Sequence, residues 1–132
     1  MKDIKLQATK TEERIVDEAS LAKNVGSGSV AVFATPMMIA LMEHTAATLL
    51  DEFLDEGETS VGVMMNTTHD AATPVGMKVY ATAEITAVDR RKVSFRIEAR
   101  DEKDVIGVAT HDRVIVGKEK FEARAAAKLE SK

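Results

Sequence analysis

The sequence predicts an α+β fold in which one long helix is held against an antiparallel sheet. Two observations support this prediction. Residues 36–54 favour a helix, because they are rich in helix-forming side chains and almost free of charge until Asp51. Residues 76–116 alternate apolar and polar side chains in segments separated by short charged turns, as half-buried strands do. The chain of 132 residues has no second apolar core, so we expect a single domain, 1–132.

Two short strands and a loop are predicted before the helix. We expect residues 12–17 and 30–33 to join the sheet. The segment between them, 18–29, ends in GSGS, a composition typical of a surface loop. Because this loop lies just before the strand that leads into the helix, a mobile flap over a pocket is the alternative interpretation.

The predicted helix has recognisable ends. Thr35 is expected to be its N-cap, and Pro36 stands at the first helical position, where the missing N–H costs nothing. Asp55, Glu56 and Gly57 mark the exit after about five turns. Apolar residues cover nearly every face of this helix, so we expect it to be buried on most sides. The rest of the chain must therefore wrap around it.

Four strands are predicted after the helix. Three of them follow one another through the tight turns 89–91 and 101–104, which indicates an antiparallel meander. The last segment, 118–132, is rich in Ala, Lys and Glu and predicts a short surface helix that frays. The predicted strands cover residues 59–68, 76–88, 92–100 and 105–116.

The composition excludes several classes of function. A formal net charge of −4 gives no basic face, so we expect no nucleic-acid partner. The sequence contains no cysteine, which excludes disulfides, thiolate metal sites and a cysteine nucleophile. Residues 1–10 contain no apolar run long enough for a signal peptide or a membrane span. We therefore expect a cytoplasmic protein with no membrane partner.

Glu43 is the most unusual polar residue, because it lies in the middle of the apolar helix. A buried carboxylate must be paired, neutralised or facing a cavity, whereas an exposed helix strip would leave Glu43 in solvent, and periodicity leaves both readings open. His69 follows a strand at a turn, where functional side chains are often placed. His44 points about 100° away from Glu43 and is interpreted as a structural or interface residue. The alternation leaves the facing of His111 open.

The motifs of several common enzyme classes are missing. The sequence lacks the GxSxG, GxGxxG, Walker and HExxH patterns. A metal site made from His69, Asp70 and His111 is disfavoured, because adjacent residues on a strand point to opposite faces. We therefore expect neither a metal nor a cofactor.

Three segments, FATPMMIALMEHTA, SVGV and THDAATPVGMKVYATAEI, resemble the hot-dog thioesterases of the fluoroacetyl-CoA thioesterase type. In that family a threonine precedes a long central helix, a glutamate lies two turns into the helix, and a histidine precedes an A-A-T-P-x-G turn. These positions correspond here to Thr35, Glu43 and His69. The resemblance covers about residues 32–121. It implies a hot-dog fold, in which a curved antiparallel sheet wraps the helix.

The resemblance also implies hydrolysis of an acyl-CoA thioester by a homodimer with active sites at the subunit interface; assembly into a tetramer stays open. Glu43 would act as nucleophile or general base, His69 as base and acid, and Thr35 would orient these groups or polarise the carbonyl. CoA is then part of the substrate and no metal is needed. The residues assigned to substrate binding are Gly62, Gly76 and Arg113.

Helix geometry constrains this implied site. Thr35 and Glu43 are eight positions apart, which separates them by roughly 12 Å along one helix. They cannot hydrogen-bond directly, so the substrate must span them or a second subunit must supply one of them. Gly62 lies on the strand after the helix, where a small residue leaves room for an acyl group or for CoA; a close strand-to-helix contact is the alternative.

Specificity and reaction type have alternatives. The fluoroacetyl-specific member carries a longer segment with aromatic residues where this chain has LAKNVGSGSV, so we expect a broader short-chain acyl-CoA specificity. A hot-dog protein that binds acyl-CoA or CoA without hydrolysis is one alternative, and a hot-dog hydratase or dehydratase is another. The second lacks its usual histidine and aspartate at the start of the helix. A purely structural dimerisation module would leave Glu43 without a role.

Overall fold

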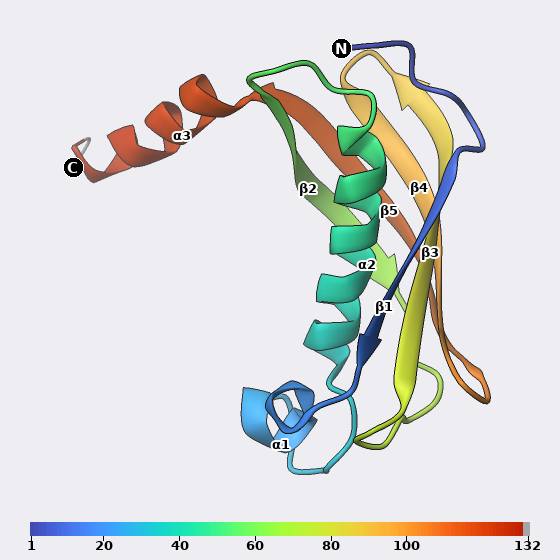
Figure 1. Ribbon diagram of the computed structural model, residues 1–132. Helices are drawn as coiled ribbons and strands as arrows, with labels where there is room; N and C mark the ends of the chain where they lie inside the picture. Colours follow the sequence, from blue (N-terminus) through green and yellow to red (C-terminus); the bar gives the residue numbers. More distant parts are fainter. Residues whose placement is uncertain (131–132) are drawn as a thin grey trace.

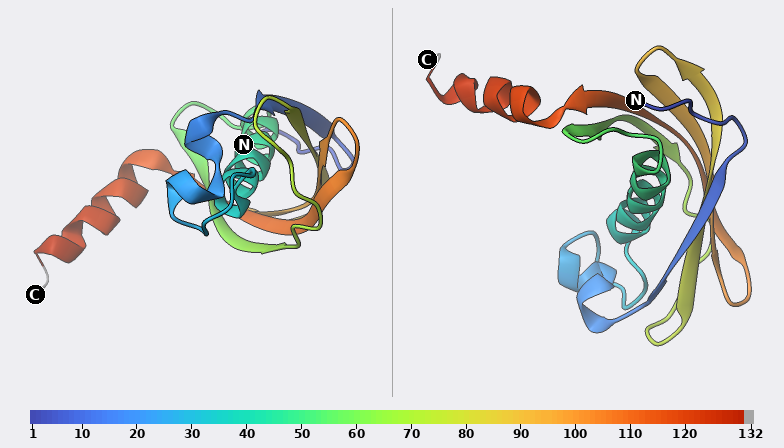
Figure 2. Two further views of the ribbon diagram at one scale, coloured as in Figure 1. Left: turned by 90° about the horizontal axis from the view of Figure 1, so that it is seen from below. Right: turned by 45° about the horizontal axis from the view of Figure 1, so that its top comes forward.

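The computed structural model describes residues 1–130 and consists of one long helix against a single sheet (Figure 1). The helix is α2 (Thr35–Asp51), and the five antiparallel strands have the order β1-β3-β4-β5-β2. Figure 2 shows the sheet curling around α2, which lies on its concave side. The predicted α+β architecture is confirmed. The strands are β1 (Thr9–Ile15), β2 (Glu58–Thr67), β3 (Lys78–Asp89), β4 (Lys92–Asp101) and β5 (Val105–Gly117).

The core lies between α2 and the concave face of the sheet. Met38, Met42 and Leu49 of α2 are at most 1% exposed. Each side chain of this size contributes roughly 1.5–3 kcal/mol through its burial. The inward positions of β3 and β4 alternate with polar outward ones, as predicted. The two strands contribute Val79, Ala81, Ala83, Ile85, Val93, Phe95, Ile97 and Ala99 to this core.

The start of α2 differs from the prediction. Ala34 occupies the N-cap position, Thr35 is already helical, and Pro36 follows it in the first turn. The prediction that Thr35 caps the helix is therefore wrong. The physical reason is that its hydroxyl group has another partner, the Nδ1 atom of His69 at 2.7 Å. At the other end the helix stops at Asp51, three residues before the predicted end.

The segment before α2 is also irregular. The predicted strand 30–33 is wrong, because Phe33 forms an isolated bridge with Leu21 outside the sheet. The N–H of Phe33 donates instead to the carbonyl of Thr73 at 2.9 Å. The predicted loop 18–29 contains two short helical segments, η1 (Glu18–Ser20) and α1 (Ala22–Val25). Leu21 is 1% exposed and joins this segment to the core.

Strand β2 contains a bulge that matters for the site. Gly62 pairs with Arg113 of β5, but Met64 pairs with Asp112, so β2 holds one extra residue between them. The bulge shifts which residues face the helix, because strand side chains alternate. Gly62 faces α2 before the bulge, and Met65 packs against the core after it.

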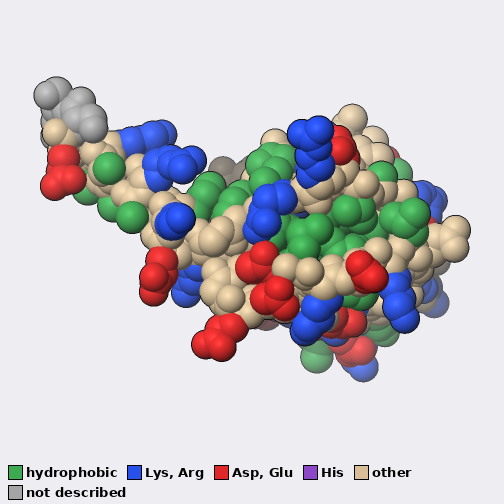
Figure 3. Space-filling model, turned by 90° about the horizontal axis from the view of Figure 1, so that it is seen from above, with side chains coloured by type: hydrophobic (Ala, Val, Ile, Leu, Met, Phe, Trp, Pro, Cys, Tyr) green, Lys and Arg blue, Asp and Glu red, His purple; other side chains and the backbone are tan. Residues whose placement is uncertain are grey.

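The predicted surface helix at the C-terminal end is confirmed as α3 (Lys118–Ala126), which η2 (Ala127–Leu129) continues. All nine residues of α3 are exposed. The helix projects away from the body, and acidic and basic side chains both occur on its surface (Figures 1 and 3). The last two residues of the predicted helix, 131–132, lie outside the described part of the chain, and the fraying of its end stays a prediction. None of the helices within residues 1–130 has the length and apolarity that crossing a membrane would require.

Candidate active site

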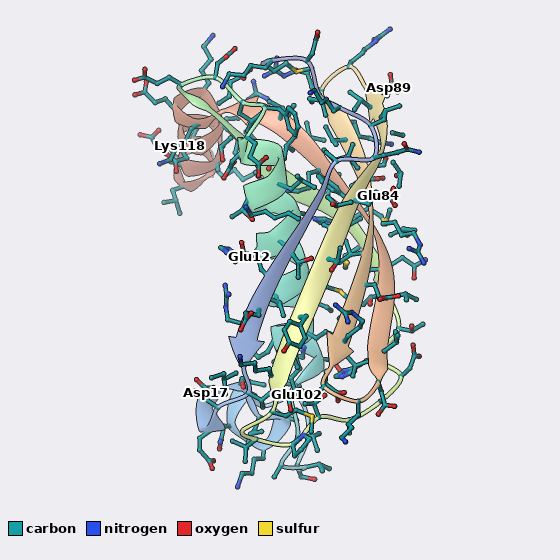
Figure 4. The ribbon with its side chains drawn as sticks, turned by 45° about the vertical axis from the view of Figure 1, so that its right-hand side comes forward. Glu12, Asp17, Glu84, Asp89, Glu102 and Lys118 are labelled. Carbon is teal, nitrogen blue, oxygen red and sulfur yellow. The ribbon has the colours of Figure 1, made fainter. Side chains whose placement is uncertain are left out.

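The first turn of α2 and the turn after β2 bring Thr35 and His69 together. The Thr35 Oγ1 and His69 Nδ1 atoms are 2.7 Å apart, a hydrogen bond whose direction depends on the histidine tautomer. Both residues line a cavity that Ala22 of α1 and Ser27 also line. This end of the molecule, where α2 begins beside α1, also carries Asp17 and Glu102 (Figures 1 and 4).

The two nitrogen atoms of the His69 imidazole differ in their hydrogen bonding, because only Nδ1 has a partner among the described residues. Among the described residues, no group hydrogen-bonds the buried Nε2 atom of His69. Burial lowers the pKa of His69 from its usual 6.5, while the charge of Asp70 acts in the opposite direction. The ring is therefore neutral at pH 7, with Nε2 available as a proton acceptor or donor.

Strand β5 supports the turn that carries His69. The N–H of Asp70 donates to the carbonyl of Ile106 at 2.6 Å, and the Thr68 hydroxyl donates to the Asp70 carboxylate at 2.9 Å. A Cβ atom added at Gly107 would lie 2.5 Å from the Thr68 carbonyl oxygen and 2.9 Å from Met38 Sδ. Gly107 is thus required for the close approach of β5 to this turn, which the sequence did not reveal.

The middle of α2 and the strands β2 and β5 form a second cluster around Glu43. The Glu43 Oε2 and Arg113 Nη1 atoms are 3.7 Å apart. The Glu43 side chain is 45% exposed, whereas the Arg113 side chain is 9% exposed. Both interpretations of Glu43 from the sequence are therefore partly correct. The side chain faces a cavity and a cation, as expected for a buried carboxylate, but it also remains accessible to water, as expected for an exposed one.

Gly62 makes this second cluster possible. A Cβ atom at Gly62 would lie 2.7 Å from Glu43 Oε2, 3.1 Å from His111 Cε1 and 3.4 Å from Arg113 Nη1. The space left by the missing side chain is occupied by these three groups. The close strand-to-helix contact, the alternative interpretation from the sequence, describes this geometry, and any role of Gly62 in substrate binding stays a prediction.

Arg113 is fixed to β2 by two further hydrogen bonds. Its Nε atom donates to Ser60 Oγ at 2.8 Å, and its Nη2 atom donates to the Ser60 carbonyl at 3.1 Å. Burial lowers the pKa of Arg113 from its ordinary value, and the charge of Glu43 opposes this shift. The guanidinium remains a cation at neutral pH. It supplies a fixed positive charge next to the Glu43 carboxylate.

The structure thus divides the predicted catalytic residues between two places in the chain. Thr35 and His69 are in contact, while Glu43 lines a separate cavity with Gly62 and Met64. This division agrees with the separation of roughly 12 Å that eight helical positions impose.

The other predicted residues have different surroundings. Gly76 has φ 94°, and its N–H donates to the carbonyl of Val16 at 2.8 Å. Its backbone conformation alone explains the glycine, so its role in substrate binding stays a prediction. His44 is exposed, and its Nε2 atom is 3.9 Å from a Glu12 carboxylate oxygen.

Sequence reasoning missed His111 as a member of the site. Its ring is 1% exposed and lies between Arg113 and the β2 bulge. An available signal was the alternation of β5, in which His111 and Arg113 share the inward phase of Ala109 and Ile115. The bulge in β2, by contrast, had no sequence signal strong enough to place it.

Comparisons with known proteins identify the family. The family model of the fluoroacetyl-CoA-specific thioesterases (FlK) matches residues 16–119. A fluoroacetyl-CoA thioesterase of Streptantibioticus cattleyicolor is 42% identical over 97 residues, which are 74% of this chain and 70% of that protein. The solved structure of the fluoroacetyl-CoA thioesterase FlK superposes with a TM-score of 0.90 at 32% identity, covering 96% of this chain and 98% of that one.

A Thermus thermophilus hypothetical protein, described as a thioesterase superfamily member, superposes with a TM-score of 0.91 at 30% identity over the full length of both chains. These similarities confirm the predicted hot-dog fold and the predicted resemblance. They also favour thioester hydrolysis over the hydratase alternative. The chain is an acyl-CoA thioesterase that belongs to the fluoroacetyl-CoA-specific thioesterase family of hot-dog proteins.

Proposed function

We propose that the protein hydrolyses short-chain acyl-CoA thioesters to the free acid and CoA, with Glu43 as nucleophile or general base. The observation that carries this proposal is the half-exposed Glu43 carboxylate held beside the buried Arg113 cation. The fixed cation is 3.7 Å from the carboxylate, and water access leaves the carboxylate oxygens free to react.

The relatives support a short acyl group. One FlK mutant, 33% identical to this chain over 89% of its length, was solved with fluoroacetate and CoA. Another FlK mutant, also 33% identical, was solved with acetyl-CoA. We therefore propose that this chain also acts on small acyl groups carried by CoA.

Thr35 and His69 supply the proton transfer in this proposal. Cleavage of the thioester C–S bond releases a thiolate, which must take up a proton. The Nε2 atom of His69, while Thr35 holds Nδ1, can donate a proton to the leaving sulfur and later take up the proton that the attacking water releases, either directly or through Glu43. The positive end of the α2 dipole at Thr35 favours the negative charge that develops on the thioester oxygen.

We also propose that the protein works as a homodimer that pairs through β2. The two sheet edges differ in character: β1 (TKTEERI) carries four charged residues, whereas β2 (ETSVGVMMNT) carries one. Charges on an edge strand block pairing with another chain. On β2, Val63 is 55% exposed and Met64 is 39% exposed, so this edge offers unpaired backbone and apolar side chains.

The β2 edge is continuous with the Glu43 cluster. Val63 and Met64 line the same cavity as Glu43 and Gly62. Antiparallel pairing of β2 with its copy reverses the strand direction, so the end of the partner that carries its threonine and histidine turns toward the Glu43 of the first subunit. An active site shared between two subunits in this way would explain why Thr35 and Glu43 lie roughly 12 Å apart along one helix.

Release of free CoA thiol from a panel of acyl-CoA esters tests the activity. We expect the fastest release from esters with short acyl groups. Binding of the same esters without thiol release would overturn hydrolysis in favour of a non-catalytic binder. Consumption of an enoyl-CoA without thiol release would favour the hydratase alternative.

A charge on the proposed dimer edge tests the interface. Val63→Lys should convert the dimer to a monomer in sedimentation measurements and lower thiol release with it. Val108→Lys is the matched control, because Val108 is exposed on the neighbouring strand β5 and away from the edge. A Val63→Lys protein that sediments as a dimer with full activity would contradict the β2 interface.

A further inference from the structure

His111 is a buried titratable residue that the reaction above does not use. It lies on β5, 1% exposed, with its ring 5.9 Å from the ring of Phe95. Its Cε1 atom would be 3.1 Å from a Cβ at Gly62. The imidazole and the Glu43 carboxylate therefore border the same space beside Gly62, and both nitrogen atoms of the ring have partners.

The partners define the tautomer of His111. The Nδ1 atom is 2.7 Å from the carbonyl oxygen of Met64, which can only accept, so Nδ1 carries the hydrogen. The Nε2 atom is 3.2 Å from Nη1 of Arg113, which can only donate, so Nε2 is bare. The two contacts are compatible only with a neutral ring.

The electrostatic surroundings favour the same neutral ring. Burial lowers the pKa of His111 below 6.5, and the charge of Arg113 lowers it further. The hydrogen bond to Met64 and the carboxylates of Glu43 and Asp112 act in the opposite direction without reversing the shift.

The contact with His111 completes the fixation of Arg113. Two guanidinium nitrogens donate to Ser60, and the third, Nη1, donates to His111. Nη1 is also the nitrogen closest to Glu43, but the 3.7 Å between Nη1 and Oε2 exceeds hydrogen-bond length. Without the acceptor on His111, Nη1 would be free to close onto the carboxylate.

We propose that His111 is a positioning residue that holds Nη1 of Arg113 back from Glu43. The cation then stabilises the charged carboxylate without occupying the lone pairs that must reach water or the thioester. Through Met64 the same ring fixes the β2 bulge that places Gly62 under Glu43. This inference rests on the proposed function, because it assigns His111 a part in the chemistry of Glu43.

Two polar substitutions separate the two contacts of the ring. In His111→Gln the amide oxygen can replace the Nε2 acceptor, whereas in His111→Asn the amide nitrogen can replace the Nδ1 donor to Met64. His111→Phe removes both contacts at similar volume. We expect His111→Asn and His111→Phe to lower kcat for thiol release roughly 10-fold or more, with a smaller change in KM. His111→Gln should restore most of kcat, and thermal melting shows whether each variant is folded.

The pattern of the three variants decides between roles. Wild-type kcat in all three would overturn the proposal, as would a His111→Asn protein that is more active than His111→Gln. A purely structural role predicts that kcat follows thermal stability, without rescue by glutamine. In a crystal structure of His111→Asn, the Nη1 atom of Arg113 should move to about 3 Å from Glu43, and an unchanged distance would also overturn the proposal.

A spectroscopic measurement is independent of activity. Nitrogen NMR of the wild-type protein should show a protonated Nδ1 and a bare Nε2 for His111 across neutral pH. A protonated Nε2 would exclude the acceptor role. Absence of thiol release by the wild-type protein would refute the proposed function, while this measurement and the crystal structure would still decide the geometry of Arg113.

Discussion

The two polar clusters along α2 are built in different ways. Thr35 and His69 meet through a helix start and a turn, and the contact that joins them is one hydrogen bond of 2.7 Å. Glu43 and Arg113 meet across a helix and a strand, and the contact that joins them is a charge interaction at 3.7 Å. The first cluster leaves a nitrogen free, and the second leaves a carboxylate half exposed.

Because of this difference, we expect substitutions to affect the two clusters through different properties. The Thr35–His69 pair depends on hydrogen-bond direction and on the protonation of one ring. The Glu43 cluster depends on charge and on the strand register that places Gly62 under the carboxylate. Substitutions that change one of these properties at a time should therefore separate the two clusters in kinetic measurements.

The largest effect is expected from removing the charge of Glu43. Glu43→Gln preserves volume and hydrogen bonding but removes the base or nucleophile, so kcat should fall roughly 10²- to 10⁴-fold. The variant should keep the melting temperature of the wild-type protein and sediment as the wild-type protein does. Unchanged turnover in this folded variant would exclude the carboxylate from the chemistry and favour the binding-only alternative.

Removal of the His69 ring should have a smaller effect. His69→Ala eliminates the proposed proton transfer but keeps the Glu43–Arg113 charge pair, so kcat should fall roughly 10²-fold. The comparison is informative when the same acyl-CoA is used at saturation for both variants. A loss larger than that of Glu43→Gln would indicate that the histidine, not the carboxylate, is the principal base.

One glycine in each cluster gives a matched pair of substitutions. Gly62→Ala places a Cβ atom 2.7 Å from the flexible end of Glu43 and 3.1 Å from Cε1 of the fixed His111 ring, so kcat should fall roughly 10-fold and stability should fall by less than in Gly107→Ala. Gly107→Ala places a Cβ atom 2.5 Å from the Thr68 carbonyl, where the backbone must move, and should lower the free energy of unfolding by about 1–3 kcal/mol. Chemical denaturation gives the free energy of unfolding of both variants, and thiol release gives their kcat. A larger loss of stability in Gly62→Ala than in Gly107→Ala would contradict this prediction.

The pH dependence should report the Thr35–His69 cluster. Because the pKa of His69 lies below 6.5, activity should stay constant through neutral pH and fall only in more acidic solution, where the ring becomes protonated. The same shift makes the contribution of His69 to stability complete above pH 6.5 and lost as pH falls through its folded pKa. An acidic limb of kcat/KM that starts above pH 6.5 would contradict the neutral ring, and His69→Ala should lack this limb.

The sequence predicted the fold and the separation of Thr35 from Glu43, but not the contacts that each of these residues makes. Helix α2 and strands β3 and β4 could be predicted because their patterns of apolar residues involve only residues close together in the sequence. The capping role assigned to Thr35 was wrong, because a distant residue, His69, takes its hydroxyl group. Similarly, Gly62 and His111 become neighbours through pairing between β2 and β5 and through a bulge, which are long-range features.

The smallest effect is expected at Thr35, and it separates catalysis from helix capping. If Thr35 were the N-cap, Thr35→Ala would destabilise the protein by about 1 kcal/mol. Because Ala34 occupies that position, Thr35→Ala should lower stability only through the lost hydrogen bond to His69, by roughly 0.5–1.5 kcal/mol, and should not lower it further when His69 is also replaced by alanine. The His69 ring is then held less firmly, so kcat should also fall, by roughly 10-fold at most. Thr35→Ser retains the hydroxyl and should be close to wild type, whereas equal losses in the serine and alanine variants would show that the methyl group matters instead.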